Sequence, residues 1–252
     1  MGREAGSQHR SMATVERAMS LVRVLEGSSR DLGTNEIARL TGLNASTVSR
    51  LLATLASEGW VSRSEETGRF RLGPRLVELG NAALARIDVR ERCRSHLLGL
   101  AEQTGETATL SIPYPDGPIT VDFVQSPSTV RSVAELGRPA VSHATATGKV
   151  YLAYTARMPE GPLTAYTSRT IIDPGALAID VARVRQRGWG QAVGEREIDL
   201  NAIAAPVLTT GGHLVGVLGL QGPAARFGPR AMRLAADTLL RHAREASSVE
   251  SA

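Results

Sequence analysis

The sequence predicts an α+β protein of two domains, a helical N-terminal part with a short β-hairpin and a C-terminal part in which helices pack on a sheet. At 252 residues, the chain exceeds the usual size of a single domain. Its first third shows apolar residues at the helical spacings of three and four. The remaining two thirds predict the order helix, antiparallel strands, helices, strands, helix, which is typical of one α+β domain.

Composition excludes several classes of protein. Hydrophobic residues make up 42% of the chain and charged residues 21%, as in a folded globular protein. No stretch approaches the roughly 20 uncharged apolar residues that a membrane helix needs. Residues 1–13 lack the apolar core of a signal peptide, so we expect a flexible N-terminal tail and a cytoplasmic protein. The single cysteine, Cys93, excludes an intramolecular disulfide and a cysteine-based zinc knuckle.

The charge is mildly basic, and the excess lies near the N-terminus. The net charge is +4, and residues 1–75 contain 11 arginines against 8 acidic residues. All basic residues except Lys149 are arginines, whose planar guanidinium groups grip phosphate oxygens in pairs. This charge permits nucleic-acid binding, but an ordinary solvated surface explains it equally well.

A first helix is expected over residues 14–27 (TVERAMSLVRVLEG), with Thr14 as its N-cap. Its inner stripe consists of Val15, Ala18, Val22 and Leu25. A short second helix is expected over residues 35–40, with Thr34 as its cap and with Ile37 and Leu40 turned inward. Gly42 then supplies a tight turn.

A longer third helix begins after Asn44, which can cap it, and ends at about Ser57. Its apolar positions are Val48, Leu51, Leu52 and Leu55. Its outer face consists of Ser46, Thr47, Ser49, Arg50 and Ala53. A short helix, a tight turn and a helix with small polar residues and arginine in its first turns predict a helix-turn-helix, whose second helix contacts bases or phosphates in the major groove. A small helical bundle that binds no nucleic acid is the alternative.

A β-hairpin is expected directly after these helices. Residues 60–63 and 69–72 form its strands, and residues 65–68 form its turn. Phe70 and Leu72 face one way, while the arginines face the other. A hairpin in this place is typical of a winged helix-turn-helix. Because the turn is acidic, the contacts to phosphates or the minor groove are assigned to the strand arginines, which are Arg63, Arg69 and Arg71.

This segment resembles the winged helix-turn-helix of the IclR family of bacterial transcriptional regulators, through LGTNEIARLTGLNASTVSRLLATLASEGWV and GRFRLGPRLVELG. The stretch STVSRLLATLASEGW fits the recognition helix of that family and its entry into the wing. We therefore place the DNA-binding domain at residues 14–74 and a linker helix at residues 75–88. In the family, such a linker helix also packs against the partner subunit.

A further helix is expected over residues 90–103, with Leu97, Leu98, Leu100 and Ala101 on its inner face. Cys93 lies near its start and is interpreted as a packed thiol rather than a sensor or nucleophile, because no basic or zinc motif accompanies it.

The strands expected after this helix lie at residues 108–112, 119–124 and 129–134, and a hairpin is expected from residues 203–208 and 214–220. Helices are expected from about Gly148 and over residues 174–187. A final helix begins at Pro229, with Met232, Ala235, Leu239 and Ala243 inward.

The C-terminal part, residues 89–250, resembles the effector-binding domain of the IclR family, which is related to the GAF fold. The resemblance is carried by PAVSHATATGKVYLAY and EREIDLNAIAAPVLTTGGHLVGVLGLQGPAARF. It implies a pocket for a small molecule, often an organic acid, lined by Ala146, Thr147, Leu200, Ala202, Gly219 and Gln221. Asp199 stands where the family often has glycine, which puts the loop around Leu200 in doubt.

The sequence contains no complete motif of a known class of enzyme. Thr147-Gly148-Lys149 suggests a phosphate-binding loop, but His143 and Val150 occupy positions that require glycine and Ser or Thr. The histidines show no paired metal spacing, so no metal and no cofactor are expected, and His143 is interpreted as a structural hydrogen-bonding residue rather than a ligand. The acidic set Glu195, Glu197 and Asp199 is either a solvated loop or part of the pocket.

The leading hypothesis is a transcriptional regulator that is not an enzyme, and a repressor rather than an activator of the same architecture. We expect it to bind a palindromic double-stranded operator as a homodimer, or as a tetramer of two dimers, under the control of a small-molecule effector. An enzyme acting on a small acid through Thr147, His143 and Glu195 is a second hypothesis, and a ligand-independent architectural DNA binder is a third.

Overall fold

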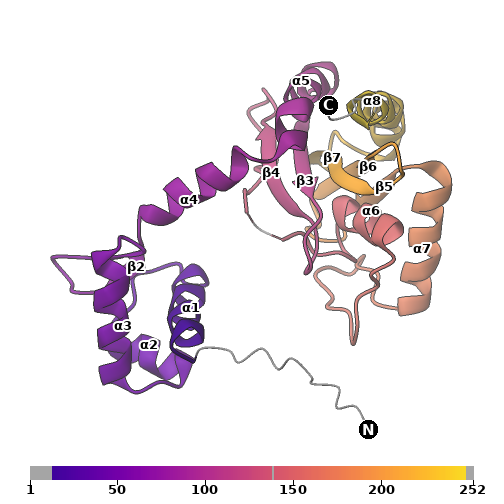
Figure 1. The fold of residues 1–252 in the computed structure, drawn as a ribbon. Helices are drawn as coiled ribbons and strands as arrows, with labels where there is room; N and C mark the ends of the chain where they lie inside the picture. The colour runs from indigo at the N-terminus through magenta and orange to yellow at the C-terminus, as the bar shows by residue number, and fades with distance from the viewer. Residues whose placement is uncertain (1–12, 138, 248–252) are drawn as a thin grey trace, which may run out of the picture. The chain divides into compact units, whose positions relative to one another are not determined.

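The computed structural model describes residues 13–137 and 139–247, and the chain divides into two compact units, Met1–Arg86 and Ile87–Ala252 (Figure 1). Each unit is described by itself. The tail expected at residues 1–13 lies outside the described residues except for Ala13, which begins the first helix.

The first unit contains the helices and the hairpin that the sequence predicts. Its elements are α1 (Ala13–Glu26), α2 (Thr34–Thr41), α3 (Ala45–Ser57), β1 (Val61–Arg63), β2 (Phe70–Leu72) and α4 (Arg75–Leu84). The Asn44 side chain caps α3 by accepting a hydrogen bond from the Thr47 backbone N–H at 2.8 Å. Gly42 ends α2 at φ 71°, in the left-handed region that favours glycine. The turn between α2 and α3 is thus set by local chemistry.

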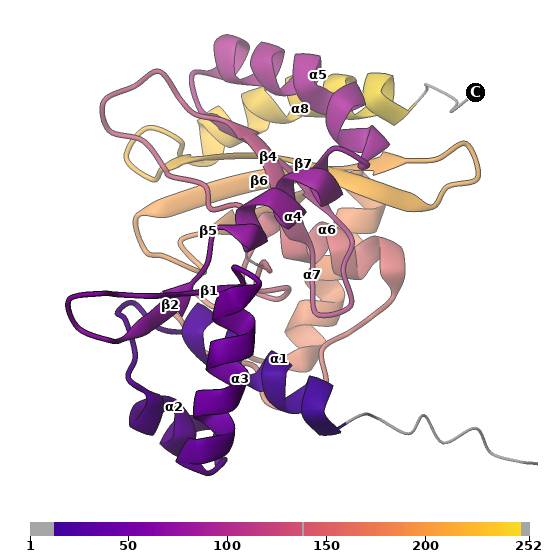
Figure 2. The ribbon, with the colours of Figure 1, turned by 60° about the vertical axis from the view of Figure 1, so that its left-hand side comes forward.

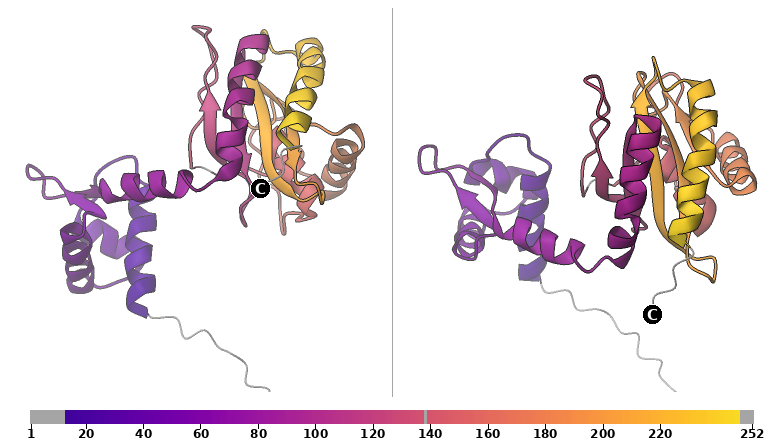
Figure 3. Two further views of the ribbon diagram at one scale, coloured as in Figure 1. Left: turned by 45° about the horizontal axis from the view of Figure 1, so that its top comes forward. Right: turned by 90° about the horizontal axis from the view of Figure 1, so that it is seen from above.

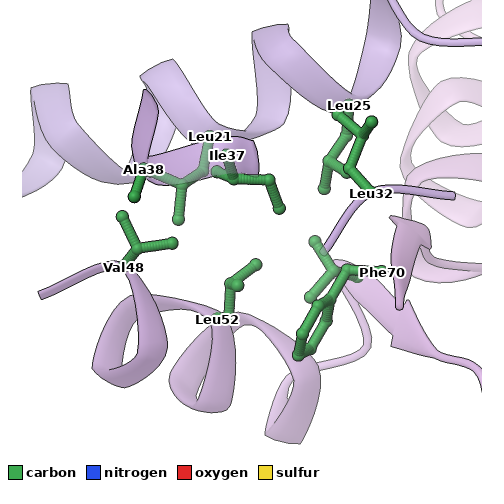
Figure 4. Close-up of a cluster of buried hydrophobic side chains, with 9 residues drawn as sticks. Leu21, Leu25, Leu32, Ile37, Ala38, Val48, Leu52 and Phe70 are labelled. Carbon is green, nitrogen blue, oxygen red and sulfur yellow. The ribbon is translucent and has the colours of Figure 1, made fainter. Parts of the chain in front are cut away.

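The core of this unit differs from the predicted stripe in several places. Figure 4 shows the side chains that converge between the helices and the hairpin, among them Leu21, Leu25, Leu32, Ile37, Ala38, Val48, Leu52 and Phe70. Val15 and Leu40, expected inside, are 54% and 57% exposed, and Leu21 and Ala38 are buried in their place. The buried positions of α1 and α2 depend on how α1 packs on α2 and on α3, which the spacing within one helix does not predict.

Two expected caps were also wrong. Thr14 lies inside α1, which already includes Ala13. The N-cap of α2 is Gly33 rather than Thr34, because the Glu36 carboxylate reaches back to accept a hydrogen bond from the Gly33 backbone N–H at 2.9 Å. The glutamate three residues into the helix is thus the sequence signal that fixes its start.

The segment before α2 pairs with strand β2 of the hairpin, a contact that the sequence did not predict. β1 and β2 pair antiparallel, with Val61 opposite Leu72. Leu32, from the loop before α2, exchanges two backbone hydrogen bonds with Phe70, of 2.8 and 2.9 Å. Phe70 is buried, but Leu72, expected on the same face, is 37% exposed. These bonds tie the hairpin to the start of α2.

The second unit is built on a five-stranded antiparallel sheet in the order β4-β3-β7-β6-β5. Its strands are β3 (Thr107–Ile112), β4 (Ile119–Val124), β5 (Gly190–Val193), β6 (Leu200–Leu208) and β7 (Leu214–Pro223). The strand expected at residues 129–134 is absent from the described structure, where this segment is irregular. β5 was not predicted, because a four-residue strand that begins with one glycine and precedes another gives little periodicity.

Helices cover both faces of this sheet, as Figure 2 shows. α5 (Asp88–Thr104) and α8 (Pro229–Ser247) lie on one face, and α6 (Ala146–Thr155) and α7 (Pro174–Arg187) lie on the other. α7 begins as predicted, with the Asp173 carboxylate accepting from the Ala176 backbone N–H at 2.7 Å. The expected inner face of α5 is wrong at Leu98, which is 51% exposed. No described helix is both long and apolar enough to cross a membrane.

Cys93 lies fully buried on α5. Burial raises the pKa of its thiol to about 11. The thiolate, which is the reactive form, is therefore disfavoured, and the interpretation as a packed thiol is confirmed.

Candidate functional site

The outer face of α3 presents small polar groups and one unpaired cation. Ser46, Ser49 and Arg50 are exposed, and Thr47 is half-buried. Ser46 donates to the Asn44 side chain at 3.0 Å, so its hydroxyl also belongs to the helix cap. Among residues 13–137 and 139–247, none forms a salt bridge with Arg50. Arg50 is therefore the cation of this face whose donors remain available to a ligand.

The wing arginines differ in how they are held. Arg69 donates to the Glu36 carboxylate at 2.7 Å and to the Asp31 carbonyl at 3.1 Å, which ties the start of β2 to α2. Arg71 lies 4.0 Å from Asp31 and is 64% exposed. The Arg63 Nε donates to the Gly68 carbonyl at 3.3 Å across the hairpin turn. Arg71 therefore has the freest guanidinium of the three, while Arg69 is committed within its own domain.

Glu36 is the centre of this small network. It also accepts a hydrogen bond from Arg30 at 2.7 Å, in addition to those from Arg69 and the Gly33 backbone. The hydrogen bond from Arg30, followed by that from Gly33, lowers the pKa of Glu36 to about 2. The carboxylate is thus ionised throughout the neutral range and holds α2 and the wing together.

A cavity of about 780 Å³ opens in the second unit between α6 and the sheet, and we call it the α6 cavity. Five of the six residues that the sequence assigned to a pocket line it, namely Ala146, Thr147, Leu200, Ala202 and Gln221. Its volume lies within the range of small-molecule sites. Residues 130–135 and 139–141, whose role the sequence did not reveal, also line it.

Gly219, the sixth residue, lies beneath this cavity rather than in its lining. A Cβ at Gly219 would meet the Thr109 hydroxyl oxygen at 2.5 Å and the Thr147 hydroxyl oxygen at 3.4 Å. Glycine on this strand therefore lets two hydroxyl groups, one from β3 and one from α6, approach the same spot.

The N-terminus of α6 faces the cavity. Thr145 caps this helix by accepting from the Gly148 backbone N–H at 3.0 Å, and residues 144–147 line the cavity. Gly148 allows the loop to pack closely, because a Cβ there would lie 2.4 Å from the Ser142 Cα. Backbone N–H groups at a helix N-terminus, with the Thr147 hydroxyl beside them, suit an anion such as a carboxylate.

Charges of both signs line the wall of the α6 cavity. Arg131 and Arg196 supply positive charge, and the Arg196 guanidinium lies 4.0 Å from the centre of the Tyr166 ring. Glu197 and Asp199 are exposed residues of the same wall. The backbone carbonyl of Asp199 accepts from the Ala224 backbone N–H at 2.7 Å, which joins this loop to the segment just after β7.

Lys149 forms a buried ionic cluster that the sequence did not predict. Its side chain is 1% exposed, and its Nζ lies 2.7 Å from Asp180 of α7 and 2.7 Å from Glu195. It also donates to the Gln191 carbonyl at 3.2 Å. The signal was present in the sequence, as the only lysine among arginines within an apolar helix. The cluster joins α6 to the loop of residues 194–199, and both line the cavity.

Glu195 is accordingly a buried structural residue. Of the two alternatives for the acidic set, the solvated loop is wrong for Glu195, and Glu195 does not line the α6 cavity either. Its carbonyl accepts from the Thr170 hydroxyl at 2.6 Å, and its Oε2 is buried without a hydrogen-bond partner among the described residues. Burial raises the pKa of this carboxyl, although the charge of Lys149 opposes the shift.

His143 hydrogen-bonds the Thr164 carbonyl at 2.9 Å, which confirms a structural role.

Comparison with known proteins decides the family. The model of the "Bacterial transcriptional regulator IclR C-terminal" family matches residues 81–248, and that of the "IclR helix-turn-helix domain" matches residues 14–65. The chain belongs to the IclR family of bacterial transcriptional regulators. It is 33% identical to the glycerol operon regulatory protein of Streptomyces griseus over 224 residues, covering 87% of this chain and 88% of that protein.

Two further members of the IclR family match a comparable share of the chain at lower sequence identity. The chain is 27% identical to the transcriptional repressor IclR of Escherichia coli over 222 residues, covering 85% of this chain and 81% of that protein. The crystal structure of an IclR regulator from Alicyclobacillus acidocaldarius matches at a TM-score of 0.80 and 26% identity, covering 94% and 98% of the two chains. These relatives are regulators, in agreement with the expectation that this IclR-family chain is not an enzyme.

Proposed function

We propose that this IclR-family regulator is a repressor whose affinity for its operator is set by a small organic acid bound in the α6 cavity. The observation that carries the proposal is the N-terminus of α6, which opens with the Thr147 hydroxyl into a cavity of about 780 Å³. The names of the Streptomyces and Escherichia coli relatives, an operon regulator and a repressor, support repression.

DNA recognition is assigned to the exposed face of α3 and to the wing. Ser46, Thr47, Ser49 and Arg50 contact the major groove, and Arg63 and Arg71 contact phosphates. Arg69 contributes mainly by holding the wing against α2, because Glu36 already occupies its guanidinium at 2.7 Å. This division of roles refines the expectation that all three wing arginines contact the nucleic acid.

The effector is proposed to be an acid with an apolar body. Its carboxylate would lie at the N–H groups of residues 146 and 147, within reach of the Thr147 hydroxyl. Gln221 would orient a polar group, and the small residues Ala202 and Ala146 would contact the apolar part. The opposite charges of Arg196 and Asp199 on the same wall would select among acids that carry a further polar group.

A homodimer, or a tetramer of two dimers, is proposed as the functional unit in the cytoplasm. α4 supports this assembly because it has no buried residue in the described chain and leaves Val77 65% exposed. Val77 and Leu79, which is 37% exposed, are apolar side chains of the linker helix that a second copy of the same helix could cover. Two copies would read half-sites about 34 Å apart on a palindromic operator.

The experiment follows fluorescent DNA from the upstream region of the gene by anisotropy while small carboxylic acids are added. An acid that raises the melting temperature of the protein is expected to lower its affinity for the DNA. Thr147→Val should weaken that acid about tenfold or more and leave DNA binding without acid unchanged. Thr155→Val, at the other end of α6, is the matched control.

Two results would contradict the proposal. One is an acid that binds with no change in DNA affinity, and the other is a panel of acids of which none binds. If the acid increases DNA affinity and activates a reporter gene, the activator of the same architecture is the correct alternative.

A further inference from the structure

A second cluster of ligating groups lies away from the α6 cavity, between α5 and α8. Both panels of Figure 3 show these helices side by side on one face of the sheet. His96 of α5 and His242 of α8 bring their Nδ1 atoms to 3.0 Å, although 146 positions separate them in the sequence. An oxygen of Glu245 lies 3.9 Å from the His96 Nδ1, and the ligating atoms of the three residues all lie within 4.8 Å of one another.

We infer that His96, His242 and Glu245 form a binding site for one divalent transition-metal ion of the zinc class. Two imidazole nitrogens and a carboxylate oxygen are a ligand set that Zn²⁺ accepts, with water completing the coordination. Imidazole ligands favour zinc, nickel, cobalt and copper over calcium and magnesium, which take oxygen ligands.

The distances between the ligating atoms are close to those that such an ion requires. With Zn–N bonds of about 2.0–2.1 Å, two nitrogens on a tetrahedral ion lie about 3.3 Å apart. The two Nδ1 atoms at 3.0 Å need to separate by only a few tenths of an ångström. The Glu245 oxygen, 3.9 Å from the His96 Nδ1, needs to approach that nitrogen by roughly half an ångström. Its side chain is 52% exposed and can make this adjustment by rotation.

The surroundings of His242 are shaped to hold an imidazole in this place. Gly99 lies inside α5, where glycine is unfavourable for a helix. A Cβ at this position would approach the His242 Cε1 to 3.0 Å, so the glycine makes room for the ring. Glycine at position 99 therefore has a physical reason that depends on His242.

A further contact holds the other side of the His242 ring. The Gln103 amide nitrogen lies 3.3 Å from the His242 Nε2, and the Gln103 amide oxygen accepts from Arg241 at 2.8 Å. When His242 binds an ion through Nδ1, its proton resides on Nε2. Rotation of the Gln103 amide would then present its oxygen to that proton in place of Arg241, as a partner of this kind does in many metal sites.

The site is independent of the proposed effector function. None of His96, His242 and Glu245 lines the α6 cavity, and the two helices that carry them lie on the other face of the sheet. A bound ion would cross-link α5 to α8 and so stabilise the second unit. Glu245 also lies 3.9 Å from Arg241, an ion pair with which the metal would compete.

The test uses the full-length protein after removal of metals with a chelator. Calorimetric titration with Zn²⁺ is expected to show one ion per chain. At an ion concentration about 100 times the dissociation constant, the melting temperature should rise by about 5–10 °C. Co²⁺, added in place of Zn²⁺, should show the visible absorption of an ion with imidazole ligands.

The variants identify the ligands. His96→Gln and Glu245→Gln should each weaken Zn²⁺ binding tenfold or more. His213→Gln, which changes an exposed histidine in the loop between β6 and β7, should leave the binding constant unchanged. His242→Gln serves as a fourth variant, but it removes a buried ring, so His96→Gln and Glu245→Gln carry the test if it does not fold.

Two outcomes would overturn the inference. One is the absence of stoichiometric Zn²⁺ binding by the wild-type protein, in which case the two histidines form only a hydrogen bond between helices. The other is binding that His96→Gln and Glu245→Gln leave intact. Either result is separate from the DNA and effector measurements, which involve other residues.

Discussion

Arg69 of the wing donates a hydrogen bond to Glu36 of helix α2 at 2.7 Å, so the hairpin and the helix-turn-helix are joined by a charged pair. The pair is partly exposed, with Arg69 42% and Glu36 27% accessible to solvent. It divides the wing arginines into one that orders the domain and others that remain available to DNA.

This division predicts different consequences for two arginine substitutions. Arg71→Ala should weaken binding to all DNA sequences and lower the slope of log affinity against log salt by about 1, because one phosphate contact is lost. Arg69→Ala should lower the free energy of unfolding by about 0.5–1 kcal/mol and change the salt slope less. Gel shifts at several salt concentrations and urea denaturation measure the two effects. Equal salt slopes for both variants would contradict the assignment.

Glu36 also predicts how the first unit responds to acid. Its pKa is lowered to about 2 in the folded state from an ordinary value near 4.5, so ionised Glu36 stabilises the fold above pH 4.5. This stabilisation is lost as the pH falls from about 4.5 towards 2. Glu36→Gln should therefore be less stable than the wild type at pH 6, and the difference should shrink at pH 2–3. Glu65→Gln, in the hairpin turn, is the control and should behave like the wild type under urea denaturation at each pH.

Substitution of Lys149 is expected to lower the stability of the second unit strongly. Lys149→Met leaves the buried Glu195 and the half-buried Asp180 without their cation, so the free energy of unfolding should fall by about 3–5 kcal/mol. Adding Glu195→Gln to this variant should restore part of the loss, because one uncompensated charge is removed. Denaturant unfolding measures both, with Arg157→Met, an exposed change just after α6, as the control. A Lys149→Met protein as stable as the wild type would show that the cluster does not hold these elements together.

The Cys93 thiol is expected to be alkylated slowly in the native protein. Because burial raises the pKa of its thiol to about 11, little thiolate exists at pH 8. Alkylation by iodoacetamide should be at least about 100-fold slower in buffer than in denaturing urea. Mass spectrometry counts a single adduct, since the chain has one cysteine. Similar rates in both solutions would mean that Cys93 is accessible in the folded protein.

Elements set by local chemistry were predictable from the sequence. Asn44 and Asp173 cap α3 and α7 as expected, and Gly42 ends α2, because each acts on backbone groups a few residues away. The pocket positions followed from the family resemblance, and five of those six residues line one cavity.

Features that depend on distant parts of the chain were missed. Leu32 pairs with Phe70 across 38 positions of the printed sequence, and Lys149 meets Asp180 and Glu195 from other elements. His96 and His242 meet only because α5 and α8 pack together on the sheet. Spacing along one segment carries no information about such pairs, which are set by the tertiary packing.

A competition gel shift measures whether this regulator recognises a specific DNA sequence through α3. Full-length protein is mixed with DNA from upstream of its gene, with scrambled DNA as competitor, and compared with Arg50→Ala and with Arg233→Ala, an exposed change on α8. The wild type and Arg233→Ala should retain the upstream DNA against competitor, and Arg50→Ala should bind it about 5–100 times more weakly. Retention that scrambled DNA removes equally well, or an Arg50→Ala protein that binds as tightly as the wild type, would contradict sequence-specific recognition through α3.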